Sequence, residues 1–523
     1  MVLSMAQSAQ RLVQGNTARV ASVPAPVGGW NARDSIANME PTDAVSLTNM
    51  FPSTASVDLR GGYTQFSTGI TGQVETLMAY AGGATNALFA IAVGSIYDVT
   101  AGGAVGAAVV TGLSNARWSY TNVATSGGNY IYAANGVDAP RLYDGSTWTA
   151  ITAISSPAIT GVTTTLLTGV ILFKNRVWFI EKNTLRAWYL PTSAVGGAAQ
   201  QLDLSSIARK GGYIVAIGSW TVDAGYGVDD NLVFITNTGE VIVYRGTDPA
   251  SASTWALTGV YNTGAPVGDR PMLKYAGDLL IITLDGLVPL SQAIQSSRVD
   301  PKVALTDKIQ GAFRASASDY KSNFGWQIQF SAINNALWVN VPTATGSAQQ
   351  QYVMNTITQS WCNFTGWNAN CWETYRDNAY FGGNGYVGLS WSSAYADNGS
   401  AIATNVLQAF NYFGSRGVKK YFTRARPSIF TSGTPAIFIG MNVDFSTDDV
   451  SAALVFNPTT AAVWDTAVWD TAVWGSGSVV SNVWLGITGL GYCGAINFQS
   501  SSTGLSVEWA STDVVYQQGW AGI

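Results

Sequence analysis

Short apolar runs alternate with clusters of turn-forming residues along most of the chain, from about residue 75 to residue 400. Runs of this kind that end at Gly, Asn or Asp are typical of strands joined by tight turns. Many of them occur in pairs, each consisting of a strand, a turn and a returning strand. The pairs begin at Ala87, Asn129, Arg176, Asn231, Asp278, Ala336 and Asn378. The pattern predicts successive β-hairpins and very little helix.

The spacing of these hairpins indicates a repeated structural unit. Their starting residues are separated by 42, 47, 55, 47, 58 and 42 residues. One four-stranded propeller blade takes about 40–50 residues, and blades arranged around an axis protect their strand edges. We therefore expect residues 75–400 to form an all-β β-propeller of roughly six to eight blades. Unrelated hairpins arranged in two β-sandwiches are the alternative interpretation.

The two ends of the chain follow a different pattern. Residues 1–74 are interrupted by Pro and Gly, which predicts an extended N-terminal arm together with the first strands. Residues 401–523 are predicted to form an additional β-rich C-terminal domain that serves as a platform or interface region.

Three tryptophans, Trp464, Trp469 and Trp474, recur at five-residue spacing within AVWDTAVWDTAVWG. A step of five residues changes face on a strand and turns a helix by roughly 140° beyond a full turn. Neither element therefore places the three indoles on one side, and we expect a bent segment with small turns at the Asp-Thr pairs. Because exposed indoles are costly, the three side chains are predicted anchors against this chain's own core or a neighbouring subunit.

The composition indicates a surface that is unusually poor in charge. Of the 523 residues, 47% are apolar and only 11% are charged, against about 25% charged residues in typical soluble domains. Electrostatic repulsion between copies of such a protein is weak and does not keep it monomeric, so we expect other subunits to cover much of its surface. The net charge of −5 is not typical of a protein that grips nucleic acid over a wide surface.

The counts of reactive residues exclude several kinds of site. The chain has no histidine, which excludes His-dependent nucleophiles and His-containing zinc sites. Its three cysteines, Cys362, Cys371 and Cys493, form no CxxC pair and cannot complete a thiolate site. A Cys362–Cys371 disulfide remains open. We expect no catalytic residues, no metal site and no cofactor, and the sequence contains no apolar run long enough for a membrane span.

Glycan hydrolysis would need two carboxylates about 5–10 Å apart. The adjacent acids Asp229-Asp230 and Asp448-Asp449 are expected to be solvated loop residues, since neighbours on a strand face opposite sides. The stretch YDGSTWT, which begins at Tyr143, is one residue shorter than the S-x-D-x-G-x-T-W box of sialidases. It predicts a hairpin turn with a packed Trp148.

One stretch, NYFGSRGVKKYFTRARPSIF, concentrates positive charge among aromatic residues. Its cations are Arg416, Lys419, Lys420, Arg424 and Arg426. Their density predicts a contact with phosphate or with an acidic partner. Two alternatives remain: a strand whose outward residues happen to be cationic, and pairing with acids of a neighbouring subunit that sets its register.

Three stretches carry a resemblance to a known family. The first, GGWNARDSIANMEPTDAVSLTNMFPSTASVDLRGGYTQF (Gly28 to Phe66), contains N-A-R-D, P-T-D-A, N-x-F-P and R-x-G-Y steps. It is followed by GQVETLMAYAGG with its hairpin, and the chain closes on FIGMNVDFSTDD and the tryptophan repeat. These stretches resemble the podophage tail nozzle family, also called tail tubular protein B-like, of short-tailed phages.

The resemblance implies a structural virion protein that contains a propeller and forms a homohexameric ring below the portal and its adaptor, the head-to-tail connector. Such a nozzle extends the portal channel, retains packaged DNA and conducts it during ejection, without sequence specificity. Tail fibres, a spike or a tail needle are further partners, and the location is the virion tail after assembly in the host cytoplasm. The family has no catalytic residues. The alternative function is a tail module that binds or cleaves a host-surface glycan.

Overall fold

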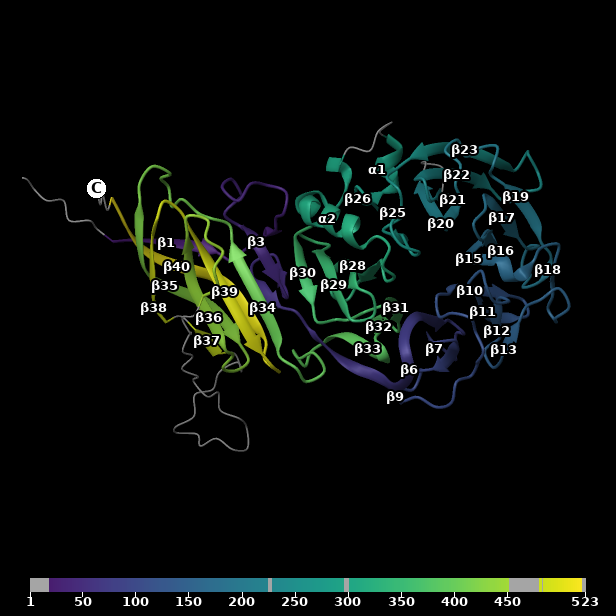
Figure 1. Ribbon diagram of the computed structural model, residues 1–523, viewed down its shortest axis with the longest axis horizontal. Helices are drawn as coiled ribbons and strands as arrows, with labels where there is room; N and C mark the ends of the chain where they lie inside the picture. The colour runs from purple at the N-terminus through teal and green to yellow at the C-terminus, as the bar shows by residue number, and fades with distance from the viewer. Residues whose placement is uncertain (1–17, 224–227, 296–300, 451–478, 482, 520–523) are drawn as a thin grey trace, which may run out of the picture.

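The computed structural model describes all residues except 1–17, 224–227, 296–300, 451–478, 482 and 520–523. The described residues are almost entirely β structure, which confirms the predicted class. They form two regions that lie side by side (Figure 1). Residues 62–392 build a β-propeller, and strands from both ends of the described chain build a β-sandwich.

Seven innermost strands surround the propeller axis in the described part of the chain. Each contacts the next in chain order, and the last contacts the first, so the ring is closed. The seven strands are β6 (Gly62–Tyr80), β10 (Ser119–Thr125), β15 (Leu167–Phe173), β20 (Ile214–Asp223), β24 (Met272–Tyr275), β27 (Gln327–Ser331) and β31 (Cys371–Tyr375). The prediction of a propeller with six to eight blades is therefore confirmed.

The other strands of each blade follow the innermost strand outward in chain order, antiparallel to one another. Blade by blade they are β7 (Ala87–Ala92) and β8 (Ser95–Asp98); β11 (Gly128–Ala134), β12 (Arg141–Tyr143) and β13 (Trp148–Ala150); β16 (Arg176–Glu181), β17 (Arg186–Tyr189) and β19 (Gln200–Asp203); β21 (Val228–Thr236), β22 (Glu240–Gly246) and β23 (Trp255–Asn262); β25 (Asp278–Thr283) and β26 (Gly286–Pro289); β28 (Ala336–Ala344), β29 (Ala348–Asn355) and β30 (Trp361–Thr365); and β32 (Asn378–Gly382) and β33 (Asn384–Ser392). Each hairpin predicted from the sequence forms the second and third strands of one blade.

Strand β6 closes the ring because it belongs to two blades. Its residues 62–73 pair with β33 as the outer strand of the seventh blade. From Val74 onward it pairs with β7 as the innermost strand of the first blade. Gly69 and Gly72, with φ of 82° and 81°, allow the strand to bend between its two partners. The beginning and the end of the propeller are thus joined by backbone hydrogen bonds.

The long connection between β26 and β27 contains the helices α1 (Leu290–Gln295) and α2 (Gln310–Tyr320). Phe313 and Ala317 of α2 are buried in one core with Ile282 of the fifth blade and Leu337 of the sixth blade. The helix therefore fills the space between these two blades.

Two sheets packed face to face form the sandwich. The first contains, in spatial order, β3 (Asp43–Thr48), β34 (Ile402–Gln408), β39 (Gly494–Ser502) and β36 (Ile437–Val443). The second contains β1 (Arg19–Pro24), β4 (Met50–Pro52), β5 (Val57–Leu59), β35 (Lys420–Thr431), β37 (Val479–Ser481), β38 (Leu485–Gly491) and β40 (Val507–Gln518). Strand β3 also continues the sixth blade, because Thr48 pairs with Asn363 of β30.

The core of the sandwich lies between these sheets. Phe498 of β39 stacks on Trp509 of β40 with ring centroids 5.1 Å apart, and both side chains are buried. Alternate residues of β35 face this core, as the two-residue period of a strand requires. The same core includes Trp338 of the sixth blade and Trp367 of the connection that follows that blade, so the apolar interior continues from one region into the other.

Short elements complete the described structure. They are β2 (Gly29–Trp30) beside β3, β9 (Gly103–Ala104) beside β6, β14 (Ile159–Thr160) beside β18 (Gly197–Ala198), and the 3₁₀ turns Thr164–Leu166, Pro301–Val303 and Asp307–Ile309. The predicted division of the chain at residues 74 and 400 stays a prediction. In space, strands β1 and β5 of the first segment pair with β40 of the last.

Candidate functional site

Arg60 and Asp397 form a buried clamp between the propeller and the sandwich. Arg60 lies where the chain enters the propeller, and Asp397 lies where it leaves. The Arg60 guanidinium has no exposed surface and donates to the two carboxylate oxygens of Asp397 at 2.9 and 2.6 Å. It also donates to the side chain of Asn49 at 2.9 Å and to the carbonyls of Gly61 and Thr365 at 2.9 and 2.5 Å. All five N–H groups of the guanidinium are thus satisfied. These bonds hold together the two segments in which the chain passes between the sandwich and the propeller.

A second group of contacts joins strand β3 to the connection between the fifth and sixth blades. The Lys308 ammonium donates to the Asp43 carboxylate at 2.6 Å. Asn31 donates to the same carboxylate at 2.8 Å, and Arg33 pairs with Asp307. Lys308 and Asp307 come from the propeller, whereas the other three precede β6. The group therefore links the two regions at another point.

One side of both groups comes from the short steps that carry the family resemblance, whereas Asp397, Lys308 and Asp307 lie elsewhere in the chain. The N-A-R-D step supplies Asn31 and Arg33, and the P-T-D-A step supplies Asp43. Asn49 belongs to the N-x-F-P step and Arg60 to the R-x-G-Y step. The first of the three stretches that carry the resemblance, Gly28 to Phe66, therefore supplies side chains that tie the propeller to the sandwich.

The predicted contact cations are divided between buried and exposed positions. Lys420 is buried, and its ammonium donates to the carbonyls of Ser415 and Tyr492, the latter at 2.8 Å. Burial lowers the pKa of Lys420. Lys420 thus stabilises the loop before β35. In that loop Arg416 lies over the ring of Tyr412, 4.5 Å from its centroid.

The remaining cations lie at the surface. Arg426 pairs with Asp513 at 2.7 Å and lies over the ring of Trp484. Arg424 is exposed on the outward side of β35. The Lys419 ammonium lies 5.6 Å from the ring centroid of Tyr492. The predicted contact of this stretch with a partner stays a prediction.

The tryptophan repeat lies outside the described residues. The predicted role of Trp464, Trp469 and Trp474 as anchors therefore stays a prediction.

Another concentration of polar contacts lies at the end of the propeller axis where the innermost strands begin. We call this end the arginine face, after Arg117 and Arg270. Arg270 precedes β24 of the fifth blade and donates to the Thr76 hydroxyl at 2.6 Å. It also donates to the carbonyls of Glu75 and Trp118 at 3.0 and 3.1 Å. These acceptors belong to the first and second blades, which lie opposite the fifth in a ring of seven, so Arg270 closes the axis.

Glu373 of β31 and Tyr120 of β10 also meet near the axis, where they share a hydrogen bond. Burial raises the pKa of Glu373 to about 7 and outweighs the hydrogen bonds from Tyr120 and from the amide of Thr374, which lower it. The Glu373 carboxyl therefore changes charge near neutral pH.

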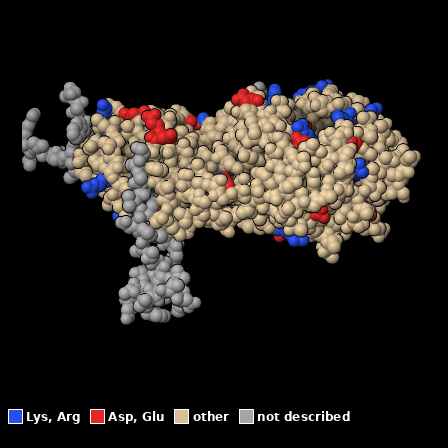
Figure 2. Space-filling view, turned by 60° about the horizontal axis from the view of Figure 1, so that its bottom comes forward, with Lys and Arg blue, Asp and Glu red and all other residues tan. Residues whose placement is uncertain are grey.

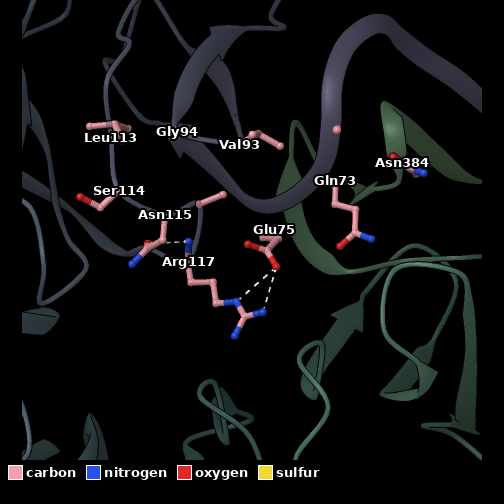
Figure 3. A pocket seen from close by; sticks show the side chains of 11 residues that line it. Gln73, Glu75, Val93, Gly94, Leu113, Ser114, Asn115, Arg117 and Asn384 are labelled. Carbon is pink, nitrogen blue, oxygen red and sulfur yellow. Dashed lines mark hydrogen bonds and ion pairs between the residues drawn. The ribbon is translucent and has the colours of Figure 1, made fainter.

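Beside Arg270, the arginine face has a hollow of about 800 Å³ (Figure 3). Its wall consists of Gly72, Gln73, Glu75, Val93, Gly94, Leu113, Ser114, Asn115, Ala116, Arg117 and Asn384. Within it Arg117 donates to Glu75 Oε1 through Nε at 3.2 Å and through Nη2 at 3.1 Å. Its guanidinium lies over the ring of Phe324, 4.2 Å from the centroid. The ion pair and the ring hold Arg117 in place.

The prediction for YDGSTWT is confirmed. Asp144 accepts hydrogen bonds from the backbone amides of Thr147 and Ser146, and these hold the pKa of Asp144 at about 2. Trp148 packs on Phe89, with ring centroids 5.1 Å apart. The stretch is a hairpin turn that supports the core between the first two blades.

The three cysteines are buried free thiols, so Cys362 and Cys371 do not form a disulfide. Burial raises the pKa of Cys371 to about 12. Among the described residues, no cluster of three or more His, Cys, Asp or Glu side chains could hold a metal ion. No helix in the described ranges is long and apolar enough to cross a membrane.

Comparison with known proteins gave structural matches only. Neither a family model nor a curated protein matches the chain. The N-terminal part of BBS1, solved in complex with ARL6, is 9% identical with a TM-score of 0.39, over 64% of this chain and 97% of that chain. YCF48 bound to a D1 peptide is 12% identical (TM-score 0.37, covering 64% and 95%). The β-propeller domain of Cps50 (Swd1) from Myceliophteria thermophila is 14% identical, with a TM-score of 0.38, over 63% of this chain and 99% of that chain.

The axial residues Arg117, Arg270 and Glu373 were not anticipated from the sequence. They lie in different blades and meet only because the ring closes. Arg270 stands in a GDRP turn between two predicted hairpins, which gave no sign of its distant acceptors.

Proposed function

We propose that this chain is a structural subunit of a short phage tail. Copies of it form a nozzle ring that extends the channel of the portal and adaptor, retains packaged DNA and conducts it during ejection. The observation that carries the proposal is the position of the family-like motif residues. Asn31, Asp43, Asn49 and Arg60 lie at the junction of the propeller and the sandwich, where a subunit under mechanical load needs a fixed angle between its parts.

The surface supports a role in assembly. On the face shown in Figure 2, Lys, Arg, Asp and Glu form small separate groups among predominantly uncharged residues. With 26 basic and 31 acidic residues in 523, electrostatic repulsion between copies is weak. A ring of such subunits can bury large areas without desolvating many charges.

The closed axis of the propeller restricts where DNA can pass. Arg270 joins opposite blades across that axis, so a duplex does not run through one propeller. The channel in our proposal lies between copies arranged in a ring. A wall with few cations releases few counterions from DNA and lets the duplex slide.

We further propose that the chain is not an enzyme. It contains no histidine, and Glu373, a carboxyl whose pKa burial raises to about 7, is bonded to Tyr120 between innermost strands. Glycan binding or cleavage is the alternative against which this proposal is tested.

The proposal is tested by assembly of the purified chain with its adaptor protein, followed by mass photometry and electron microscopy. We expect a ring of six copies that continues the adaptor channel. A chain that stays monomeric at micromolar concentration in the presence of the adaptor would contradict the proposal.

A second measurement separates the alternative function. The chain is incubated with surface polysaccharide of the host, and binding and new reducing ends are measured. We expect neither. Release of reducing ends that is abolished by replacing a single carboxylate would establish the alternative and overturn the structural role.

A further inference from the structure

The hollow on the arginine face presents a cation with an unused hydrogen-bonding edge. One carboxylate oxygen of Glu75, Oε1, accepts hydrogen bonds from both Nε and Nη2 of Arg117. The third nitrogen, Nη1, points away from Glu75 in Figure 3 and makes no hydrogen bond to any described residue. The Arg117 side chain is 47% exposed. A guanidinium edge of this kind binds a carboxylate through two parallel hydrogen bonds.

Arg117 is held in position before any ligand arrives. The ring of Phe324 lies on one side of the guanidinium, and Glu75, with only 16% of its side chain exposed, fixes the Nε edge. The backbone amide of Arg117 also donates to Asn115 Oδ1 at 3.0 Å. A fixed guanidinium loses little conformational entropy on binding, so its outer edge is a prepared site for an anion.

The rest of the wall suits a polypeptide. Gln73 and Asn384 carry amide groups, which donate and accept as the peptide backbone does (Figure 3). Val93, at the tip of the β7–β8 hairpin, is 67% exposed and has a φ of 37°. Its isopropyl group offers an apolar contact beside the amides, and such a mixture is typical of surfaces that bind extended peptides.

Two other classes of ligand fit the hollow less well. The wall includes no aromatic residue among those described, and the nearby ring of Phe324 is covered by Arg117 and Arg270, at 4.2 and 5.5 Å from its centroid. A sugar ring therefore finds no free aromatic face for stacking. The Glu75 carboxylate in the wall repels a nucleic-acid backbone, whose charges are closely spaced.

We propose that this hollow binds an extended peptide segment of a partner protein that presents one acidic residue to Arg117. One Asp or Glu carboxylate of the segment lies on the outer edge of Arg117, and its backbone bonds to the amides of Gln73 and Asn384. Glu75 competes for the same guanidinium and keeps the affinity moderate. The proposal concerns the propeller alone and does not depend on ring formation.

The test uses synthetic dodecapeptides with a single Asp or Glu in a Gly, Ala and Ser background, each matched by a peptide with Asn or Gln at that position. Binding to the full chain is measured by fluorescence anisotropy. We expect the acidic peptides of at least one register to bind about tenfold more tightly than their amide counterparts, as a charge-assisted bidentate pair provides.

Three variants assign the preference to the hollow. Arg117→Gln removes the preference for acidic peptides. Glu75→Gln strengthens their binding, because it removes a competing negative charge while the side-chain oxygen of Gln can still accept from Arg117 and keep it in place. Arg314→Gln is the matched control: Arg314 of α2 is 45% exposed and pairs with Asp285 at 3.9 Å, so its loss leaves the preference unchanged.

The proposal is overturned if acidic and amide peptides bind equally, or if Arg117→Gln retains the preference. It is also overturned if oligogalacturonate binds in an Arg117-dependent manner and the peptides do not. Circular dichroism and the thermal midpoint check folding of each variant. If Arg117→Gln does not fold, Arg117→Lys replaces it; a lysine keeps the charge but loses the two-pronged edge, and we expect it to reduce the acidic preference severalfold.

Discussion

The propeller and the sandwich are both β structures, but they use the chain in opposite ways. In the propeller, neighbouring strands of a blade are neighbours in sequence, and one strand, β6, closes the ring. In the sandwich, β40 pairs with β1 and β5, so the two ends of the described chain form one sheet. The propeller can therefore form blade by blade, whereas the sandwich needs both ends of the chain at once.

This difference gives the junction its importance. The chain leaves the sandwich through Arg60 and returns to it through Asp397, so one buried ion pair joins both crossings. Buried pairs with all donors satisfied contribute less to net stability than to a fixed geometry. We therefore expect the clamp to couple the unfolding of the propeller to the unfolding of the sandwich.

The largest effect is expected for Arg60→Met. The change leaves the buried Asp397 carboxylate without its partner and should lower the free energy of unfolding by about 3–5 kcal/mol. Urea unfolding measures this loss, and hydrogen exchange of peptides from β7–β33 and from β34–β40 shows where it occurs. We expect both regions to lose protection together. Arg314→Met serves as the control, and a loss confined to the sandwich would show that the two regions are independent.

A medium effect is expected for Glu373→Gln, which acts on the propeller alone. Burial raises the pKa of Glu373 from 4.5 to about 7 in the folded state. The folded state thus binds more protons than the unfolded state between about pH 4.5 and 7, and the free energy of unfolding falls as pH rises through this window. The Glu373→Gln variant lacks this fall, and the free energies of unfolding of the two proteins should therefore diverge by about 3 kcal/mol across the window.

The measurement compares urea unfolding of the wild type and Glu373→Gln from pH 4.5 to pH 8. The sandwich carries a similar group, Asp58, whose pKa burial raises to about 6. Asp58 is present in both proteins, so its contribution cancels in the difference. Two curves that remain parallel across the window would show that Glu373 keeps an ordinary pKa.

The smallest effect on stability is expected for Arg424→Gln. Because Arg424 is exposed on β35, the free energy of unfolding should change by less than about 0.5 kcal/mol. If the basic stretch contacts DNA or an acidic partner, the variant should nevertheless weaken that association and reduce its salt dependence. Mass photometry of the assembly at two salt concentrations tests this. Unchanged association would assign Arg424 to an outward strand face without a contact role.

The hairpins and their spacing were readable from the sequence because they depend on local chemistry. Apolar runs, turn residues and the length of a blade each involve residues close in the chain. The turn at Asp144 and the packing of Trp148 were predicted for the same reason. The absence of histidine likewise excluded classes of chemistry without any knowledge of the fold.

Tertiary structure alone decided how distant residues meet. Asn49, Arg60 and Asp397 come together only when β5 and β34 join the same sandwich. Lys420 points inward, where two backbone carbonyls accept hydrogen bonds from its ammonium. Arg270 reaches Thr76 only when seven blades close around an axis. Local patterns predict which element each residue occupies. Contacts across hundreds of residues depend on ring closure and sheet pairing, and these are set by the burial of the whole core.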